Sequence, residues 1–564
     1  MKLVIVESPN KCKKIASYLG PDYRVVATVG HFRDLPAKEL AVDEETLEPT
    51  YVVDPKKKDV LKRIKTEASK ASEVFLAPDP DREGEAIGWH VAQVLKLGAK
   101  AKRIIFNEIT KQAVENAVAM PKPIDINLVN AQQARRVLDR LVGYKVSPLI
   151  QRLGKGLSAG RVQTATLHIV AQRERDRLNF VPEAYFVIKV IYQNGMTAEL
   201  ADEKGKPIRL KDEAESKKVF ESAKNILHVV KSVDRKVVDK KPPAPFTTST
   251  LQQVASARLN FVPEKTMKVA QALFEAGAIT YHRSDSVNLS EDSVKLARGW
   301  IEKNQPESLP EKPPIFRSKE GAQEAHEAIR PSSMEDPDLS GDEKALYNLI
   351  RIRFLACQMK PAKLAKTLVL TALVSGDHFF AARGTEILEP HWLKLEKHKE
   401  DEEDKDDRED ADQDLPSVEP DQELPVDRVD HLAKETTPPP RFTEAGLVKE
   451  MEKLGICTLK NKSDHLVKNV VLLFELKNVV GQVSTANFFS SNARFENGHG
   501  QFDAERIYPE IGQGFQKITF LNLDTAELEI TLMAEDFRKT NWTTSIKRTE
   551  SGYSVDTKLD EDGN

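Results

Sequence analysis

Three short apolar runs alternate with amphipathic stretches in the first part of the chain. The apolar runs lie at residues 3–6, 74–77 and 103–106 and are rich in branched side chains. Between them, apolar residues recur at helical spacing over 56–71 and 85–97. Alternation of buried strands with helices is typical of a mostly parallel sheet covered by helices. The pattern therefore predicts an α/β domain at the start of the chain.

The pattern changes several times further along the chain. Residues 125–185 are helical and basic, and 186–240 alternate in the way that short strands do. Helical spacing returns over 247–355, and strand-like alternation returns over 365–440. Because strand-rich stretches lie on both sides of the helical block, we expect one domain to carry another as an insertion.

Length and composition limit the class of protein. A chain of 564 residues suggests about three to five domains. No apolar run approaches the roughly 20 residues that span a bilayer, and the run at 3–6 is too short for a secretory signal. Cys12, Cys357 and Cys457 lie far apart, which argues against a disulfide framework or a four-cysteine zinc site. We therefore expect a cytoplasmic protein without a membrane segment.

The formal net charge of −4 is unevenly distributed. Residues 400–414 hold 11 acidic and 2 basic side chains, so the remainder of the chain is mildly basic, at about +5. We interpret this stretch as a solvated acidic loop, with a DNA-mimicking segment as the alternative. A mildly basic body is compatible with a nucleic-acid partner.

Acidic residues follow the first two apolar runs. Glu7 follows the first run, and Asp79, Asp81 and Glu83 follow the second at intervals of two residues. In an extended chain these three side chains face the same way, with Gly84 turning the chain into the next helix. The carboxyl ends of parallel strands share one edge of a sheet, so Glu7 can join them. An all-oxygen cluster of this kind suits Mg²⁺, whereas the simpler alternative is a set of turn and helix-capping residues.

Tyr281 lies in the segment AGAITYHRSDS. A helix is expected to begin at Pro263 and to end before Gly277, shortly ahead of it. A tyrosine hydroxyl has a pKa near 10 and is a weak nucleophile until a base or cation assists it. Arg283 lies on the same side in an extended chain and could stabilise the charge of a phenolate or a phosphoryl oxygen. A tyrosine taken alone is more often a packing residue.

Many segments together resemble the type IA DNA topoisomerase family. The Glu and DxDxE pattern resembles the TOPRIM domain, and ITYHRSDS resembles the family's nucleophile motif. The resemblance covers roughly residues 1–456 and is strongest to bacterial members. The other matching segments are VESPNKCKKI at 6–15, GHFRDLP at 30–36, DPDREGEAIGWH at 79–90, RIIFNEIT at 103–110, QQARRVLDRLVGYKVSPL at 132–149, GLSAGRVQT at 156–164, APFTTSTLQQVAS at 244–256, QEAHEAIRPS at 323–332 and PPPRFTEAGLVKEMEKLGI at 438–456.

The resemblance implies a multidomain α/β and α+β fold. A Rossmann-like TOPRIM domain, helical domains and a β-rich domain are expected to form a toroidal core. The implied domains are the TOPRIM domain at 1–125, a basic helical DNA-binding domain at 126–185, a β-rich arch at 186–246 and 356–440, the helical domain of Tyr281 at 247–355, a second part of the DNA-binding domain from 441–456, and an atypical region at 457–564.

The resemblance also implies a reaction. A monomer is expected to cleave one strand of single-stranded or underwound DNA through a 5′-phosphotyrosine link, to pass a strand and to rejoin the ends. Negatively supercoiled DNA would be relaxed without ATP, and the sequence has no GxxxxGK[ST] phosphate loop. A nuclease or primase with a TOPRIM domain is the less favoured alternative, because such enzymes need no covalent tyrosine.

Roles are carried over onto matching residues. Tyr281 is the implied nucleophile, Arg283 and Lys11 stabilise phosphate charge, Glu7 is a proton donor, and His326 positions DNA or assists proton movement. The implied Mg²⁺ ligands are Asp79 and Asp81 with Glu7 or Glu83. The implied DNA-binding residues are His31, Arg135, Arg136, Asp139, Tyr144, Ser158, Ala159, Gly160, Arg161, Val162, Gln163 and Arg283.

The chain departs from the family pattern after residue 456. The family continues with a GRPSTYA-type motif, whereas this chain continues with CTLKNKSDHLVKNVV at 457–471. Its cysteines cannot form the zinc ribbons that are common in bacterial members. Alternating segments at 517–521 and 527–532 favour a small β-rich region. The alternative function is therefore a topoisomerase-like protein that binds and cleaves single-stranded DNA but passes strands weakly or not at all.

Overall fold

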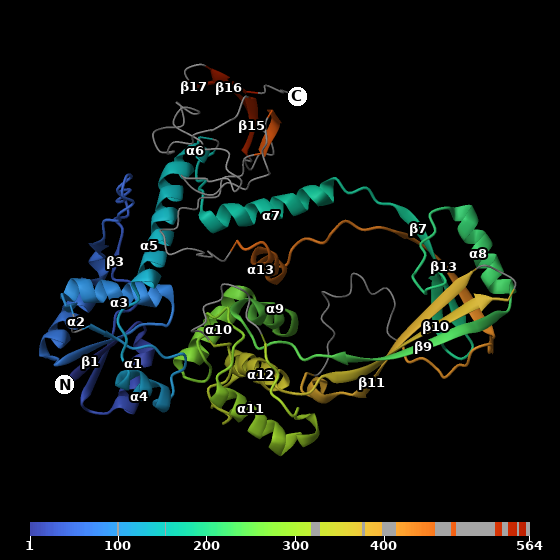
Figure 1. The fold of residues 1–564 in the computed structure, drawn as a ribbon, viewed down its shortest axis with the longest axis horizontal. Helices are drawn as coiled ribbons and strands as arrows, with labels where there is room; N and C mark the ends of the chain where they lie inside the picture. Colours follow the sequence, from blue (N-terminus) through green and yellow to red (C-terminus); the bar gives the residue numbers. More distant parts are fainter. Residues whose placement is uncertain are drawn as a thin grey trace.

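The elements follow one another around a ring in the computed structural model (Figure 1). A parallel sheet with its helices begins the ring, a long basic helix and an antiparallel sheet continue it, and a block of helices closes it against the first sheet. The structure describes residues 1–98, 101–152, 154–316, 327–374, 378–396 and 413–456, and the backbone of four later strands. In this part of the chain, no helix combines the length and apolar character that a membrane crossing requires.

The N-terminal sheet is parallel. Its strands, in spatial order, are β2 (Tyr23–Ala27), β1 (Lys2–Val6), β5 (Glu73–Ala77) and β6 (Ala101–Arg103). The surrounding helices are α1 (Pro9–Leu19), α2 (Lys58–Lys70), α3 (Arg82–Leu95) and α4 (Lys111–Ala119), and the smaller elements are β3 (Arg33–Asp34), β4 (Val52–Val53) and η1 (Pro55–Lys57). Side chains on both faces of β1 are buried, because helices cover both sides of the sheet.

Two predicted elements have different bounds in the structure. The third strand is displaced from 103–106, because it ends at Arg103 and the following apolar residues, Ile104 and Phe106, pack into the core. Helix α3 begins at Arg82 rather than at Glu85. The earlier start of α3 changes the directions of the acidic side chains at its beginning.

A basic helical segment connects the parallel sheet to the rest of the ring. It comprises α5 (Ile126–Leu141), the π-helical turn η3 (Val142–Val146), α6 (Ser147–Ile150) and α7 (Arg161–Leu178). Helix α5 packs on α3, and α7 crosses toward the antiparallel sheet (Figure 1). Helix α13 (Glu444–Lys453) returns near α9 and α7 at the end of the well-described chain.

The antiparallel sheet has seven strands drawn from both sides of the central helical block. In spatial order they are β12 (Glu423–Leu424), β9 (His228–Lys240), β10 (Ala362–Leu373), β11 (Phe379–Glu389), β8 (Thr197–Ala201), β7 (Ala184–Tyr192) and β13 (Val426–Glu435). Helix α8 (Glu213–Asn225) packs on this sheet and was not predicted. Its apolar residues Val219, Phe220 and Ala223 do recur at helical spacing after the capping residue Asp212.

The central block holds α9 (Thr248–Leu259), α10 (Pro263–Glu275), α11 (Glu291–Asn304) and α12 (Gly341–Ala356), with η4 (Pro306–Ser308) and η5 (His391–Lys394). The predicted helix from Pro263 is confirmed, and it ends before Gly277, whose φ of 68° suits a glycine after a helix. Phe246, Phe274 and Ile279 of this block share one buried cluster with Val4 and Phe106 of the N-terminal domain. The two parts therefore meet through a continuous apolar contact.

The described strands of the C-terminal region form a separate antiparallel sheet. They are β14 (Glu475–Val480), β15 (Thr525–Leu532), β16 (Thr540–Thr549) and β17 (Gly552–Leu559), paired in sequence order. The segment expected to be extended at 527–532 lies within β15, whereas 517–521 lies outside the described residues.

Candidate active site

The carboxyl edge of the parallel sheet brings Glu7 near Asp79. Val6 at the end of β1 pairs with Ala77 at the end of β5, so the residues that follow both strands emerge side by side. Burial, followed by the negative charge of Asp79, raises the pKa of Glu7 to about 7, although the Lys11 ammonium acts in the opposite direction. Such a carboxyl can hold a proton near neutral pH.

The Arg103 side chain holds the loop that carries Asp79 in place. Its side chain is completely buried and forms an ion pair with Glu85 at 2.7 Å from Nε to Oε2. The same guanidinium donates to the backbone carbonyls of Leu76, Pro78 and Asp79. A charged residue at the head of the apolar run 103–106 was a sequence signal for this anchor, although the residue pattern did not lead us to predict it.

Asp81 uses its two carboxylate oxygens differently. Oδ1 accepts from the Gly84 amide at 2.8 Å and caps α3, whereas Oδ2 accepts from the Tyr281 hydroxyl at 2.6 Å. Gly84 approaches the Asp79 backbone so closely that an added Cβ would lie 2.1 Å from its carbonyl oxygen. Asp81 is therefore both a helix cap, as the simpler alternative held, and a direct partner of the predicted nucleophile.

Glu83 lies in the first turn of α3, so the extended geometry on which its placement beside Asp79 and Asp81 was based does not hold, and its role as a metal ligand stays a prediction. Because α3 begins before Glu83, that residue follows helical rather than extended geometry. Its Oε2 lies 3.3 Å from His31 Nε2 and accepts from Gln132 Nε2 at 3.0 Å, while Oε1 lies 3.9 Å from Arg135 Nη1. Burial opposes ionisation, but the bonds from His31 and Gln132 and the nearby positive charges lower the pKa of Glu83 to about 2.

Tyr281 is enclosed at the contact between the N-terminal domain and the central block. Only 3% of its surface is exposed, and its ring packs edge-on against Phe274 at 5.2 Å between centroids. Burial and the charges of Asp81 and Asp79 raise the pKa of the hydroxyl. Arg283 Nη1 lies 4.0 Å from Asp81 Oδ2, so its guanidinium accompanies the tyrosine as expected. The hydroxyl must exchange its bond to Asp81 for a bond to phosphorus if it is to react.

Lys11 contacts the acidic loop at Asp79. It is 2% exposed, forms an ion pair with Asp79, and lies 4.7 Å from the centroid of the Phe274 ring. Burial of the ammonium among a carboxylate and an aromatic face favours a fixed position. Lys11 and Arg283 therefore place two cations around the carboxylates beside Tyr281.

The backbone on either side of Tyr281 is fixed by three neighbours. The Thr280 amide donates to the Arg330 carbonyl at 2.9 Å, and the Tyr281 amide donates to the Asn107 carbonyl at 2.8 Å. The Thr248 hydroxyl at the start of α9 donates to the His282 carbonyl at 2.9 Å. The loop that carries Tyr281 is thus held by its own domain and by the N-terminal domain together.

The basic residues of α5 and its continuation lie over the 34–39 segment. Arg136 donates to both carboxylate oxygens of Asp34, at 2.9 and 2.7 Å, and the Tyr144 hydroxyl donates to the Ala37 carbonyl at 2.7 Å. These groups have protein partners in the structure, so a contact with DNA requires those partners to be shared or exchanged.

The small residues Ser158, Ala159 and Gly160 lie directly before the first turn of α7. The Ala159 amide donates to Ser147 Oγ at 3.0 Å, and Arg161 Nε donates to Asp139 Oδ1 at 3.1 Å. Gly160 is the N-cap and has no side chain to cap the amides that follow. A helix start of this kind presents N–H groups and partial positive charge that suit a phosphate. Of the other predicted residues, Val162 and Gln163 belong to this first turn, and Ser158 lies in the segment just before it.

The structure supports the predicted Mg²⁺ site only in the chemical type of the side chains that gather there. Glu7, Asp79 and Asp81 supply oxygen donors of the kind that Mg²⁺ prefers, and their mutual repulsion would be relieved by a cation. Among the described residues, however, no three acidic, histidine or cysteine side chains converge in a geometry ready to hold a metal ion. Asp79 and Asp81 contact Lys11 and Tyr281 instead. His326 lies outside the described residues.

Comparisons with known proteins give two family matches along the chain. Residues 2–109 match the Toprim domain family, and residues 123–468 match the DNA topoisomerase family. The chain is 42% identical over 478 residues to DNA topoisomerase 1 of Campylobacter jejuni and 41% identical over 503 residues to that of Haemophilus influenzae. In both cases 80% of this chain is covered, and 66% and 57% of the relatives, respectively. The chain thus spans less than two thirds of the length of these curated relatives.

A solved structure extends the similarity to the whole chain. Full-length topoisomerase I of Thermotoga maritima matches with a TM-score of 0.71 and 30% identity, covering 100% of this chain and 97% of that one.

The chain belongs to the type IA DNA topoisomerase family. Its similarity is to the bacterial DNA topoisomerase 1 members of that family. The predicted family and the multidomain α/β and α+β fold with a TOPRIM domain in a toroidal core are confirmed. The family match ends at residue 468, slightly beyond the predicted 456. The domain boundaries remain predictions.

Proposed function

We propose that this protein is an ATP-independent type IA topoisomerase that relaxes negatively supercoiled DNA. Tyr281 attacks a phosphodiester of a single strand, becomes linked to the 5′ phosphate and releases a 3′ hydroxyl. The observation that carries the proposal is the 2.6 Å hydrogen bond from the Tyr281 hydroxyl to Asp81, with Arg283 beside it. A carboxylate acceptor and a guanidinium at one hydroxyl can receive its proton and stabilise phosphoryl charge.

The surrounding side chains support the remaining roles. Arg283 and Lys11 stabilise the charge of the phosphate, and Glu7, whose pKa is raised to about 7, donates a proton to the leaving 3′ oxygen. Rejoining is the reverse reaction. One phosphodiester is exchanged for another throughout, so no nucleotide hydrolysis is required.

Mg²⁺ is the proposed cofactor, held by Asp79 and Asp81 together with Glu7 or Glu83, and Glu7 would join the ligands only after it has given up its proton. When bound there it would neutralise clustered carboxylates and attract the DNA phosphates. Glu83 is a less suitable ligand, because His31, Gln132 and Arg135 already surround its carboxylate. His31 and Arg135 instead present positive or donor groups at the edge of the site and suit backbone phosphates.

The proposed partner is single-stranded or underwound DNA, bound by a monomer in the cytoplasm and nucleoid. The first turn of α7 and the residues just before it, 158–163, would receive phosphates through backbone amides. Arg136, Asp139 and Tyr144 form the neighbouring face of the same segment. His326 is proposed to assist at the site by its place in the family motif alone.

Plasmid relaxation tests the proposal. Negatively supercoiled plasmid with Mg²⁺ and without ATP should lose supercoils in steps of linking number, and Tyr281→Phe should show neither relaxation nor a covalent adduct. A protein that forms the adduct with a single-stranded oligonucleotide but never changes linking number would instead be a strand-cleaving relative without strand passage. No adduct with either substrate would overturn both functions.

A further inference from the structure

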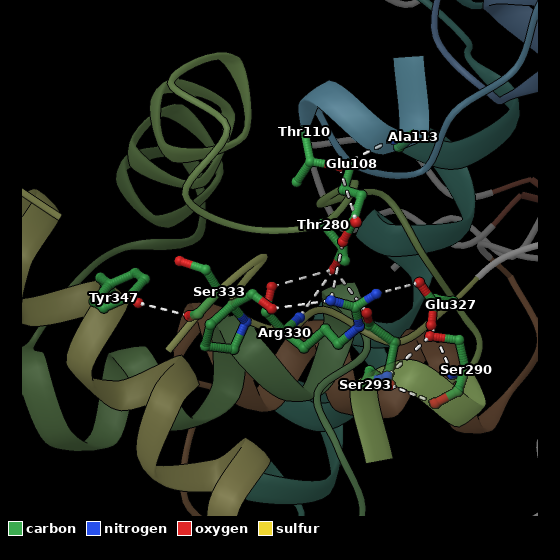
Figure 2. Close-up of polar contacts among 12 residues, drawn as sticks. Glu108, Thr110, Ala113, Thr280, Ser290, Ser293, Glu327, Arg330, Ser333 and Tyr347 are labelled. Carbon is green, nitrogen blue, oxygen red and sulfur yellow. Dashed lines mark hydrogen bonds and ion pairs between the residues drawn. The ribbon is translucent and has the colours of Figure 1, made fainter. Parts of the chain in front are cut away.

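The contact between Glu108 and Arg330 joins the two domains that meet at Tyr281. Glu108 belongs to the part of the chain that matches the Toprim family, and Arg330 belongs to the central helical block. Arg330 Nη1 lies 3.0 Å from Glu108 Oε2, with 6% and 22% of the two side chains exposed. Figure 2 shows the guanidinium between two carboxylates, those of Glu108 and Glu327.

The two carboxylates differ in the domain that carries them. Glu327 Oε2 accepts from Arg330 Nη2 at 2.7 Å, and its Oε1 accepts from the Ser290 amide at the start of α11, so it is tied to the central block (Figure 2). Glu108 Oε1 accepts from the Thr110 hydroxyl, which caps α4 of the N-terminal domain. Separation of the domains would therefore break the Glu108 contact and leave the Glu327 contact intact.

The same pair of segments also holds the nucleophile backbone. Asn107, next to Glu108, accepts from the Tyr281 amide at 2.8 Å across the domain contact. Arg330 accepts from the Thr280 amide through its own carbonyl, and its amide donates to Thr280 Oγ1 at 2.9 Å. The buried neighbours Phe106 and Ile109 hold the 107–108 segment in the apolar cluster that the two domains share.

We propose that Glu108 and Arg330 are positioning residues that form an interdomain latch. The latch consists of the Glu108–Arg330 ion pair and the hydrogen bond from the Tyr281 backbone amide to the Asn107 carbonyl. When both are formed, the Tyr281 loop is seated beside Asp81; when both are broken, the loop leaves with the central block. The inference rests on the proposed function, in which the broken strand opens as these domains separate.

The negative charge of Glu108 lowers the frequency with which the latch opens. Glu108→Gln keeps the shape and one acceptor oxygen but removes the charge, and Arg330 retains Glu327 as a counter-ion. The two charges attract each other across 3.0 Å, and the partial exposure of Glu108 reduces the gain from that attraction. We expect opening to become roughly tenfold more frequent, which corresponds to about 1.4 kcal/mol.

Hydrogen exchange of single backbone amides in the DNA-free full-length protein tests the latch without requiring activity. The Tyr281 amide reports the interdomain bond, and the Thr280 amide, bonded within the central block, is the internal control. In E108Q the Tyr281 amide should exchange roughly tenfold faster while the Thr280 amide stays unchanged. E108D, which keeps the charge, should recover part of the protection, and the matched control E327Q should leave the ratio of the two amides unchanged.

Three outcomes would overturn the latch. The first is an unchanged exchange rate of the Tyr281 amide in E108Q. The second is an equal rise of the Tyr281 and Thr280 exchange rates in E108Q. The third is a ratio of these two rates that changes as much in E327Q as in E108Q.

A second measurement separates this inference from the proposed function. With a single-stranded oligonucleotide and Mg²⁺, E108Q should increase the fraction of cleaved, covalently linked DNA relative to rejoined DNA by several-fold, because parted ends rejoin more slowly. If the unmodified protein forms no adduct at all, the proposed function fails and the exchange result still decides the latch. If the unmodified protein forms adduct but E108Q leaves both the ratio and the exchange unaltered, only the latch fails.

Discussion

Replacing Gly84 with alanine should disable the site through one backbone contact. A Cβ at Gly84 would lie 2.1 Å from the Asp79 carbonyl oxygen and 2.8 Å from the Asp79 amide nitrogen, and both are backbone atoms that cannot rotate away. Gly88, one turn later in α3, is the matched control. Its added Cβ would meet only the Leu76 side chain at 3.9 Å, an ordinary van der Waals separation.

The magnitude follows from these separations. Both substitutions gain helix propensity of up to about 1 kcal/mol, so Gly88→Ala should leave stability unchanged or slightly raised. Gly84→Ala must widen the gap to Asp79 by about 1 Å, at a typical cost of about 1–3 kcal/mol for overpacking. A displacement of about 1 Å in a reacting constellation can reduce the rate by about 100-fold. The carboxylates of Asp79 and Asp81 would both move, because Asp79 takes part in the strained contact and Asp81 lies between Asp79 and Gly84 in the chain.

The assay compares the two variants for formation of the covalent adduct on a single-stranded oligonucleotide, with thermal unfolding measured in parallel. G84A should form adduct about 100-fold more slowly than G88A and unfold at a lower temperature. If G84A were as stable and as active as G88A, the close approach of α3 to Asp79 would be unimportant, and the account of how the acidic loop is positioned would be wrong.

Two further variants test the burial of charged and titratable groups. Arg103→Met leaves the buried carboxylate of Glu85 without its ion-pair partner and should destabilise the N-terminal domain by about 3–5 kcal/mol in urea unfolding; a change below about 1 kcal/mol would contradict the anchor. Burial lowers the pKa of His282 to about 3, so the folded protein keeps it neutral while the unfolded chain protonates near pH 6.5. Stability should therefore fall by about 1.5 kcal/mol from this group between pH 6.5 and 5, and His282→Phe, which keeps the ring contacts to Phe274 and Tyr281, should flatten that part of the profile. An equally steep profile in the variant would mean that another group titrates.

The parallel sheet and the helix before Tyr281 could be predicted because their signals are local. Apolar runs and helical spacing mark each element, and Pro263 and Gly277 mark both ends of α10. The side of the chain on which Glu83 lies could not be predicted in the same way, because it depends on α3 starting at Arg82. That start follows from the Asp81 cap and from the room that Gly84 provides against Asp79.

Contacts between distant segments were the least predictable part of the site. The residue patterns mark Tyr281 and the acidic loop separately, and only the fold shows the hydroxyl of one bonded to Asp81 of the other. Arg330 and Glu108 carry no pattern that pairs them, since their meeting depends on how two domains pack. By contrast, α8 was predictable from its capping aspartate and its apolar spacing, and it was missed because strand alternation surrounds it.

The most direct test of the account is to identify the residue that carries the DNA. A single-stranded oligonucleotide would be incubated with the full-length protein and Mg²⁺, the complex denatured, and the protein digested and analysed by mass spectrometry for a peptide bearing a 5′-phosphorylated nucleotide. The account predicts the modification on Tyr281 and its loss in Tyr281→Phe. A covalent nucleotide on any other residue, or an adduct that persists in Tyr281→Phe, would contradict it.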